Sequence, residues 1–395
     1  MTRGEGDSGL GYPEVPGSNP GPGTTGNRYE NRNDTGLRSL PRAADLRLVR
    51  CPPPRHFPEM VRLSRELFRL IVEEHGTEGA LRRLADPRWF QSLACLLGYE
   101  RDTSGSTTVV TAALREALDP EEHGLTLVGG KGRLGLRTPE LIRERAEALD
   151  VDPEPLIDAS RLAAKSDTVC LQDGHDLYHH TIAFDESGRW VVIQQGMNPE
   201  ARTARRYHWS WREAERFTEL HPVAASAPAD VLSLQGDRPA GCRRAILDLV
   251  SEGPDRVLRE WRRVRAAIRG PLDRFLDADR GVEVPEGILR RLPRRLDRGA
   301  LERLYERDPE DFTDLLRTRG VGPSLTRALA LIAEVVHGEG PDYRDPAEYT
   351  LAFGCKSGDP FPVDRELMSL AAELLERVDS RRLRRFLRAR GPSQS

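Results

Sequence analysis

Apolar residues recur at helical spacing in the first part of this chain, and two strand-like stretches separated by a turn lie near its middle. The stretch 58–74 carries apolar residues three and four positions apart, and 87–97 repeats this pattern. Residues 177–184 and 189–196 are rich in the β-branched, aromatic and other residues that favour strands, and the turn-forming residues 185–188 separate these two stretches. The pattern predicts two packing helices followed by an antiparallel β-hairpin. Shorter stretches predict a helix after residue 104, a strand over 125–128, and helices near 139–149 and 154–165.

The C-terminal part of the chain has helical periodicity alone. Helices are predicted over 241–251, 254–268, 285–292, 299–306, 309–318, 323–337, 364–377 and 380–389. Residues 1–37 are rich in Gly, Pro, Asn and Asp, which indicates a disordered tail, and the Pro, Ala and Ser of 222–240 favour a linker. We therefore expect an α+β N-terminal domain with a small antiparallel sheet over 38–221. An all-helical C-terminal domain is expected over 241–395.

Composition narrows the class of protein. Of 395 residues, 38% are hydrophobic and 31% are charged, which suits a folded core with a charged surface. The sequence has no run of about 18 apolar residues and no apolar segment near its N-terminus, so we expect neither a membrane span nor a secretory signal. Five cysteines are scattered without a CxxC pair, which argues against a disulfide framework and predicts a cytoplasmic protein.

The basic residues are unusual in type more than in number. The net charge of −3 does not by itself indicate a nucleic-acid partner. Only three of the 60 basic residues are lysines, namely Lys131, Lys165 and Lys356. A compact ammonium makes phosphate contacts and proton transfers that a guanidinium does not. Because Lys131 follows Gly129 and Gly130 at the end of a predicted strand, we interpret it as a phosphate contact, with an ordinary turn as the alternative.

Carboxylate and imidazole side chains gather at the open end of the predicted hairpin. Asp173, His179 and His180 lie there, and Lys165 precedes them. Such a cluster beside apolar strands is typical of an active site. Asp173 and His180 are candidate ligands of a divalent magnesium or manganese ion that would activate water to attack a phosphodiester. His179 and His180 are candidate acid–base groups, and Lys165 would stabilise negative charge; the alternative is a structural polar network.

The register of the hairpin follows from its turn. If Phe184 lies opposite Arg189, then His179 lies opposite Gln194. Strand alternation places His179 and His180 on opposite faces of the sheet.

A glycine-containing turn between two predicted helices is the strongest motif of the chain. In DFTDLLRTRGVGPSLTRALALIAE, one helix ends before Gly320, and the next begins after Gly322 at a proline. Glycines leave backbone N–H groups uncovered, and with the helix N-terminus these groups can hold a phosphate oxygen. The segment resembles the helix-hairpin-helix motif of DNA repair proteins, which implies contacts to the DNA backbone. The candidate DNA-binding residues are Arg319, Gly320, Val321, Gly322, Ser324 and, in the N-terminal domain, Lys131.

A second resemblance concerns the helix-hairpin-helix glycosylases, whose catalytic aspartate lies in a Val-Asp segment after the hairpin. The sequence FPVDREL places Asp364 in a similar context. The catalytic lysine of the bifunctional members corresponds to Ser324, so the resemblance implies base excision without lyase chemistry. The alternative is that Asp364 caps the helix that follows it.

Over about residues 37–380 the chain also resembles an uncharacterised archaeal and bacterial family, domain of unknown function 763. The segments QDG, LYHH, GRWVVIQQGMN, RYHW and GVGP…RALALIAE carry this resemblance. Together the motifs predict a metal-dependent DNA nuclease that grips the DNA backbone through its C-terminal hairpin. The alternatives are a DNA glycosylase that uses Asp364 and a non-enzymatic DNA-binding protein.

Overall fold

The computed structural model describes residues 43–47, 54, 56–98, 104–213, 216–219, 223–224, 230–269 and 284–345. The chain divides into two units, Met1–Arg38 and Ser39–Ser395, and all described elements belong to the second. The predicted tail and the helices predicted over 364–377 and 380–389 lie outside the described residues. None of the described helices is long and apolar enough to cross a membrane.

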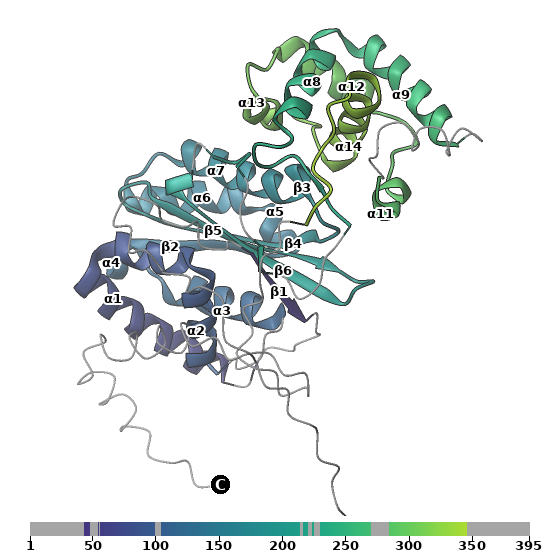
Figure 1. Ribbon diagram of the computed structural model, residues 1–395. Helices are drawn as coiled ribbons and strands as arrows, with labels where there is room; N and C mark the ends of the chain where they lie inside the picture. Colours follow the sequence, from purple (N-terminus) through teal and green to yellow (C-terminus); the bar gives the residue numbers. More distant parts are fainter. Residues whose placement is uncertain are drawn as a thin grey trace, which may run out of the picture. The chain divides into compact units, whose positions relative to one another are not determined.

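A six-stranded sheet organises the first part of this unit (Figure 1). Neighbouring strands run antiparallel, except that β1 and β7 are parallel. Their spatial order is β2 (Leu125–Lys131), β4 (Asp176–Asp185), β5 (Trp190–Asn198), β6 (Thr203–Ser210), β1 (Ala43–Arg47) and β7 (Val223–Ala224). The expected mixture of helices with a small antiparallel sheet is therefore confirmed, and the predicted hairpin is its β4–β5 pair.

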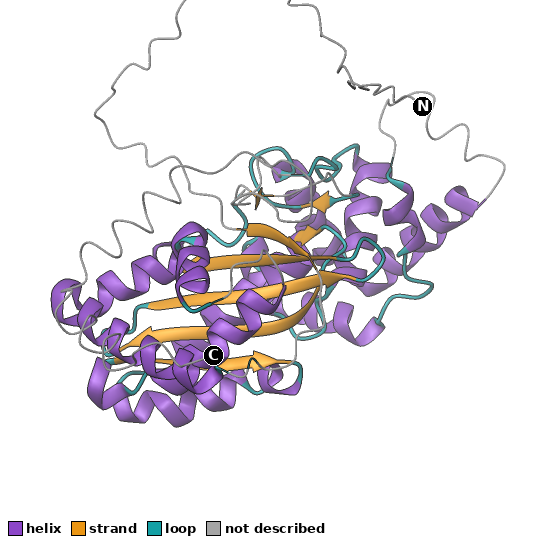
Figure 2. Cartoon of the chain, turned by 90° about the horizontal axis from the view of Figure 1, so that it is seen from below, coloured by secondary structure: helices purple, strands orange, loops and turns teal. Residues whose placement is uncertain are grey.

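Helices cover both faces of the sheet (Figure 2). One face is covered by α1 (Phe57–Ala85), α2 (Pro87–Leu96), α3 (Ser104–Ala117) and α4 (Pro120–His123). The other is covered by α5 (Arg133–Leu136), α6 (Thr138–Ala146) and α7 (Pro153–Lys165). Successive residues of β4 serve different cores, since Ala183 packs with the α1–α3 layer and Phe184 with the α6–α7 layer.

The β4–β5 register differs by one residue from the prediction. Phe184 lies opposite Trp190, so His180 opposes Gln194 and His179 opposes Gln195. The turn is one residue shorter than predicted, because a hydrogen bond from the Asp185 N–H to the Arg189 carbonyl oxygen closes the strands around residues 186–188. A β-bulge after Leu177 shifts the register again.

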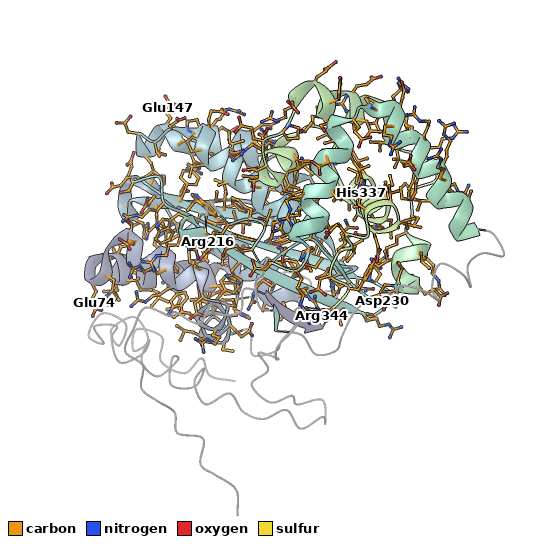
Figure 3. The ribbon with its side chains drawn as sticks, turned by 45° about the horizontal axis from the view of Figure 1, so that its top comes forward. Glu74, Glu147, Arg216, Asp230, His337 and Arg344 are labelled. Carbon is orange, nitrogen blue, oxygen red and sulfur yellow. The ribbon has the colours of Figure 1, made fainter. Side chains whose placement is uncertain are left out.

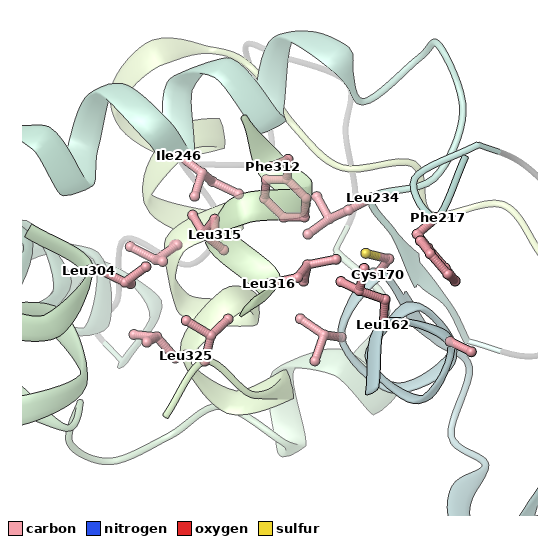
Figure 4. Packing of buried hydrophobic residues seen from close by; sticks show 14 of the residues in the cluster. Leu162, Cys170, Phe217, Leu234, Ile246, Leu304, Phe312, Leu315, Leu316 and Leu325 are labelled. Carbon is pink, nitrogen blue, oxygen red and sulfur yellow. The ribbon is translucent and has the colours of Figure 1, made fainter. Parts of the chain in front are cut away.

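The later helices pack on one another and against the sheet layers. They are α8 (Ala240–Ser251), α9 (Pro254–Arg269), α11 (Glu286–Arg290), α12 (Arg298–Arg307), α13 (Phe312–Arg317) and α14 (Pro323–Ile332). Leu162 of α7 belongs to the same buried cluster as Leu316 and Leu325 of the hairpin helices (Figure 4). Charged side chains occupy the outer helical surfaces, where Glu74, Glu147 and His337 are exposed (Figure 3).

Part of the segment predicted to be a linker is core. Val231, Leu232 and Leu234 are fully buried. The short strand β8 (Leu232–Ser233) pairs with β3 (Leu171–Gln172), whose last residue is the first of the QDG sequence. The linker interpretation is wrong here, because four consecutive residues with three large apolar side chains outweigh the Pro and Ser around them.

Lys165 joins the sheet layers to the hairpin. Its ammonium donates to the carbonyl oxygen of Leu316 and, at 3.1 Å, to that of Thr318, at the C-terminal end of α13. Burial, with a smaller effect of Arg161, lowers the pKa of Lys165 to about 8. The predicted role of Lys165 in stabilising charge at the hairpin mouth is therefore wrong, because its donors are used by a helix end, where a cation is favourable.

Lys165→Met should lower the free energy of unfolding by about 1–3 kcal/mol, because it leaves two carbonyl oxygens at the end of α13 without this donor. Lys131→Met is the matched control, since Lys131 is exposed and makes no such contact with α13. Urea unfolding of both variants checks this. Equal stability of the two would contradict the assigned role.

Candidate nucleic-acid interface and buried polar network

The turn between α13 and α14 needs glycine at one position and leaves space at the other. Gly320 has φ +95°, and a Cβ there would lie 2.9 Å from the Cβ of Ala300. Gly322 is extended, with φ −144°, and no atom of the described residues lies within 4 Å of the position of a Cβ. Gly320 is therefore required by backbone conformation and packing, whereas the open space at Gly322 does not demand a glycine for folding.

The exposed side of this turn carries the groups that a phosphate would meet. Gly322 is the N-cap residue of α14, and no side chain caps the helix. The first N–H groups of a helix have no intrahelical partner, and its N-terminus favours an anion. Arg319 and Ser324 are exposed beside it, while Val321 is buried and anchors the turn. The structure thus places five of the six predicted DNA-binding residues in this one turn.

The turn is supported from the QDG segment of β3. The Gln172 side-chain amide donates to the Thr326 hydroxyl at 3.2 Å, and Thr326 in turn donates to the Gly322 carbonyl oxygen at 3.1 Å. All three groups are buried or half-buried. Lys165 contacts the end of α13, and Gln172 contacts α14. Both helices of the hairpin are therefore held by residues that precede β4 in the sequence. Two motifs about 150 residues apart in sequence, QDG and GVGP, are therefore neighbours.

Asp173 is a buried carboxylate that is already neutralised by protein. Its Oδ2 accepts from Arg205 and from the Tyr207 hydroxyl, each at 2.8 Å, and its Oδ1 accepts from the His175 N–H at 3.0 Å. Burial alone would raise its pKa, but Arg205 and the His175 contacts outweigh burial, and the pKa falls well below its usual range. Arg205 also reaches Asp345. Asp173 is therefore charged, and its oxygens are engaged by cationic and neutral donors.

His180 belongs to a chain of hydrogen bonds that ties α7 to the sheet. Its Nε2 lies 2.7 Å from the Ser160 hydroxyl, and its Nδ1 lies 2.7 Å from Oε1 of Gln194. Gln194 donates through its amide to Asp167, which also accepts from the Trp209 indole at 2.8 Å. Since Oε1 of Gln194 only accepts, Nδ1 carries the proton, and Nε2 accepts from Ser160. Burial lowers the pKa of His180.

His179 faces the opposite helical layer, as strand alternation predicts. Its Nε2 lies 2.9 Å from the Thr111 hydroxyl of α3, while its buried Nδ1 has no partner among the described residues. On the same face, Gln195 accepts from the Thr107 hydroxyl. Burial, with the nearby charge of His180, lowers the pKa of His179 to about 3. This histidine is therefore neutral at neutral pH.

These contacts do not support the predicted metal site. Asp173 and His180 bind different partners, and His179 lies on the other face of the sheet from His180. Within the described ranges, no group of three or more His, Cys, Asp or Glu side chains is arranged to hold a metal ion. The pairing of Asp173 with His180 as ligands is wrong because an arginine and a tyrosine take the carboxylate, and a serine and a glutamine take the imidazole.

The remaining predicted residues lie apart from this network or outside the described residues. Lys131 is exposed at the end of β2, with its ammonium 5.6 Å from the centre of the Tyr178 ring. Asp364 lies outside the described residues. The sequence reasoning missed Arg205, although two arginines within the otherwise apolar and aromatic strand ARRYHW were a signal of buried charge.

Comparisons with known proteins give one match. The family model described as "Protein of unknown function (DUF763)" matches residues 42–363. The matched residues include the QDG segment, His179 and His180, the turn between α13 and α14, and Lys165. No curated protein and no solved structure matches the chain.

The buried histidines should make stability depend on pH. The unfolded state binds a proton at His179 below about pH 6.5, whereas the folded state does not until about pH 3, so stability is lost as pH falls through this window. His179→Gln should reduce this loss by up to about 1.4 kcal/mol per pH unit. Urea unfolding at pH 7, 6 and 5 measures it.

The control for this measurement is His337→Gln, because His337 is exposed and its imidazole stays in water in both states. It should keep the wild-type dependence on pH. An identical dependence in wild type and His179→Gln would show that His179 is not held neutral in the folded protein.

Proposed function

The chain belongs to the DUF763 family of proteins of unknown function, and from this premise we propose that it binds the backbone of duplex DNA through the turn between α13 and α14. The observation that carries the proposal is the uncapped N-terminus of the ten-residue helix α14 behind an exposed glycine turn. Backbone N–H groups and Arg319 would meet phosphate oxygens there. Such contacts position the duplex without reading its sequence.

Rigid support favours this reading over an ordinary helical hairpin. Val321 is buried beneath the turn, and Lys165 and Gln172 engage the end of α13 and the start of α14. A turn that is held from below keeps its N–H groups in place before the ligand arrives, which reduces the ordering that binding requires. The Arg303 guanidinium also donates to the Arg319 carbonyl oxygen at 2.8 Å, which fixes the backbone at the exposed side.

Catalysis has weaker support than binding. The metal-dependent nuclease depends on Asp173, His179 and His180, whose described contacts are those of a structural network. The glycosylase depends on Asp364, which lies outside the described residues. We therefore propose DNA-backbone binding as the function and leave scission and base excision as the alternatives that an assay distinguishes.

Gly322→Val should weaken DNA binding about tenfold or more while the protein stays folded. The extended backbone and open space at Gly322 accept a side chain, but that side chain would cover the N–H groups that phosphate needs. Fluorescence anisotropy with duplexes of two unrelated sequences measures the affinity, and thermal unfolding checks the fold. Unchanged affinity in folded Gly322→Val would rule out the hairpin as the binding surface.

The chemistry is tested with labelled single-stranded, duplex, flap and uracil-containing DNA, each with and without manganese. We expect the protein to bind duplex DNA and to leave every DNA intact, with or without manganese, because the described polar residues are engaged with one another. Scission that requires manganese and is lost in Asp173→Asn would instead support the nuclease. Abasic sites formed without metal, and lost in Asp364→Asn, would select the glycosylase.

A further inference from the structure

Nitrogen donors crowd one side of Gly174, in the loop between β3 and β4. A Cβ at Gly174 would lie 2.9 Å from Nη2 and 3.1 Å from Nη1 of Arg291, and 3.2 Å from Nδ2 of Asn198. The residue also has φ +85°, which favours glycine. The absence of a side chain therefore lets the end of α11 bring a guanidinium directly against the QDGH loop.

The Asn198 amide is oriented with its donor toward this place. Its Oδ1 accepts from the N–H groups of Glu200 and Ala201, at 3.1 and 3.0 Å. The oxygen is thereby used, and Nδ2 is the atom that faces Gly174. Two different side chains thus present N–H groups at the same point.

Arg327 of α14 adds a second guanidinium beside the first. Its Nη1 donates to the Arg291 carbonyl oxygen, its side chain is only 6% exposed, and its Nε has no partner among the described residues. Burial and the charge of Arg291 lower the pKa of Arg327 to about 10. A buried cation with an unused donor next to another cation is unfavourable unless an anion offsets it.

The carboxylates around these arginines do not supply that anion. Asp176 attracts Arg327 but is exposed, and no ion pair in the described part of the chain joins a carboxylate to Arg291 or Arg327. Asp173, in the same loop, is bonded to Arg205. The two guanidinium groups therefore retain the capacity to bind an anion from outside.

We propose that Arg291, Arg327 and Asn198 form a second phosphate-binding site, which holds another backbone phosphate of the nucleic acid that the hairpin binds. This inference rests on the proposed function. Arginine suits phosphate because its planar fork donates two hydrogen bonds to two oxygens. Gly322 and Arg327 are separated by about 7.5 Å along α14 at about 1.5 Å per residue. A strand of duplex DNA carries one phosphate per about 3.4 Å of axis, so this axial separation is short enough for one strand to span.

The test compares Arg291→Gln with Arg290→Gln. Arg291 is exposed and makes no ion pair in the described chain, so its loss should not unfold the protein. Arg290 is its sequence neighbour and pairs with Glu286 on the surface, so it is the matched control. Calorimetric titration with inorganic phosphate at low salt should show binding by wild type and Arg290→Gln, and at least tenfold weaker binding by Arg291→Gln.

The DNA arm measures the salt dependence of duplex affinity. Arg291→Gln should lower the slope of log affinity against log salt by about one, the change expected when one phosphate contact is lost. Arg290→Gln should keep the wild-type slope. An unchanged slope in Arg291→Gln would overturn the assignment to the DNA backbone. Phosphate binding by Gly322→Val, in which the hairpin is blocked, that does not depend on Arg291 would overturn the site itself.

The hairpin proposal and the second-site proposal give separate results. In Gly322→Val, duplex affinity should fall while calorimetric phosphate binding at Arg291 persists, because the two sites use different groups. If wild type bound phosphate through Arg291 but retained no duplex, the proposed function would be wrong and the phosphate would belong to a smaller molecule, which also contradicts the backbone assignment.

Discussion

The buried carboxylate of Asp173 constrains the loop on which the candidate interface rests. It stays ionised inside the protein only because Arg205 and Tyr207 reach it from β6 and the His175 backbone donates to it. Removing one partner of such a buried pair typically costs about 3–5 kcal/mol, because the other charge stays unpaired. This anchoring holds the QDGH loop in one conformation, from which Gln172 reaches the hairpin and Gly174 admits Arg291.

A second constraint acts on His179 and His180. Because helices cover both faces of the sheet, the polar side chains on each face need hydrogen-bond partners inside the protein. His179 and His180 are adjacent in β4, so each needs partners from a different helical layer: Thr111 from α3 and Ser160 from α7. Gln195 and Gln194, opposite them in β5, complete the two networks. A cluster that is dense in the sequence is thus divided in space, which explains why it resembles an active site in sequence and a pair of structural networks in three dimensions.

The predicted catalytic and DNA-binding regions are far apart in the sequence but in direct contact in the structure. Lys165 and Gln172, from the region assigned to chemistry, contact α13 and α14 directly, and Leu232 and Leu234 pack into the shared core. Lys165, one of only three lysines, and Gln172 of the QDG segment act as supports of the hairpin. The candidate function therefore lies in the surface that they hold, where Arg319, Gly322 and Arg291 are available to a ligand.

The sequence by itself determined the longer described helices and the central strand hairpin, because helical periodicity and a turn between strand-forming stretches are local properties that survive without knowledge of neighbours. It also determined the glycine turn at Gly320, whose left-handed φ is a local requirement. Only the tertiary structure decided the register of His180, which the turn closed at Asp185 and Arg189 shifted by one residue, and the partners of Asp173 and Lys165. Whether a buried carboxylate meets a metal ion or an arginine depends on strands and helices distant in sequence, so no local pattern specifies it.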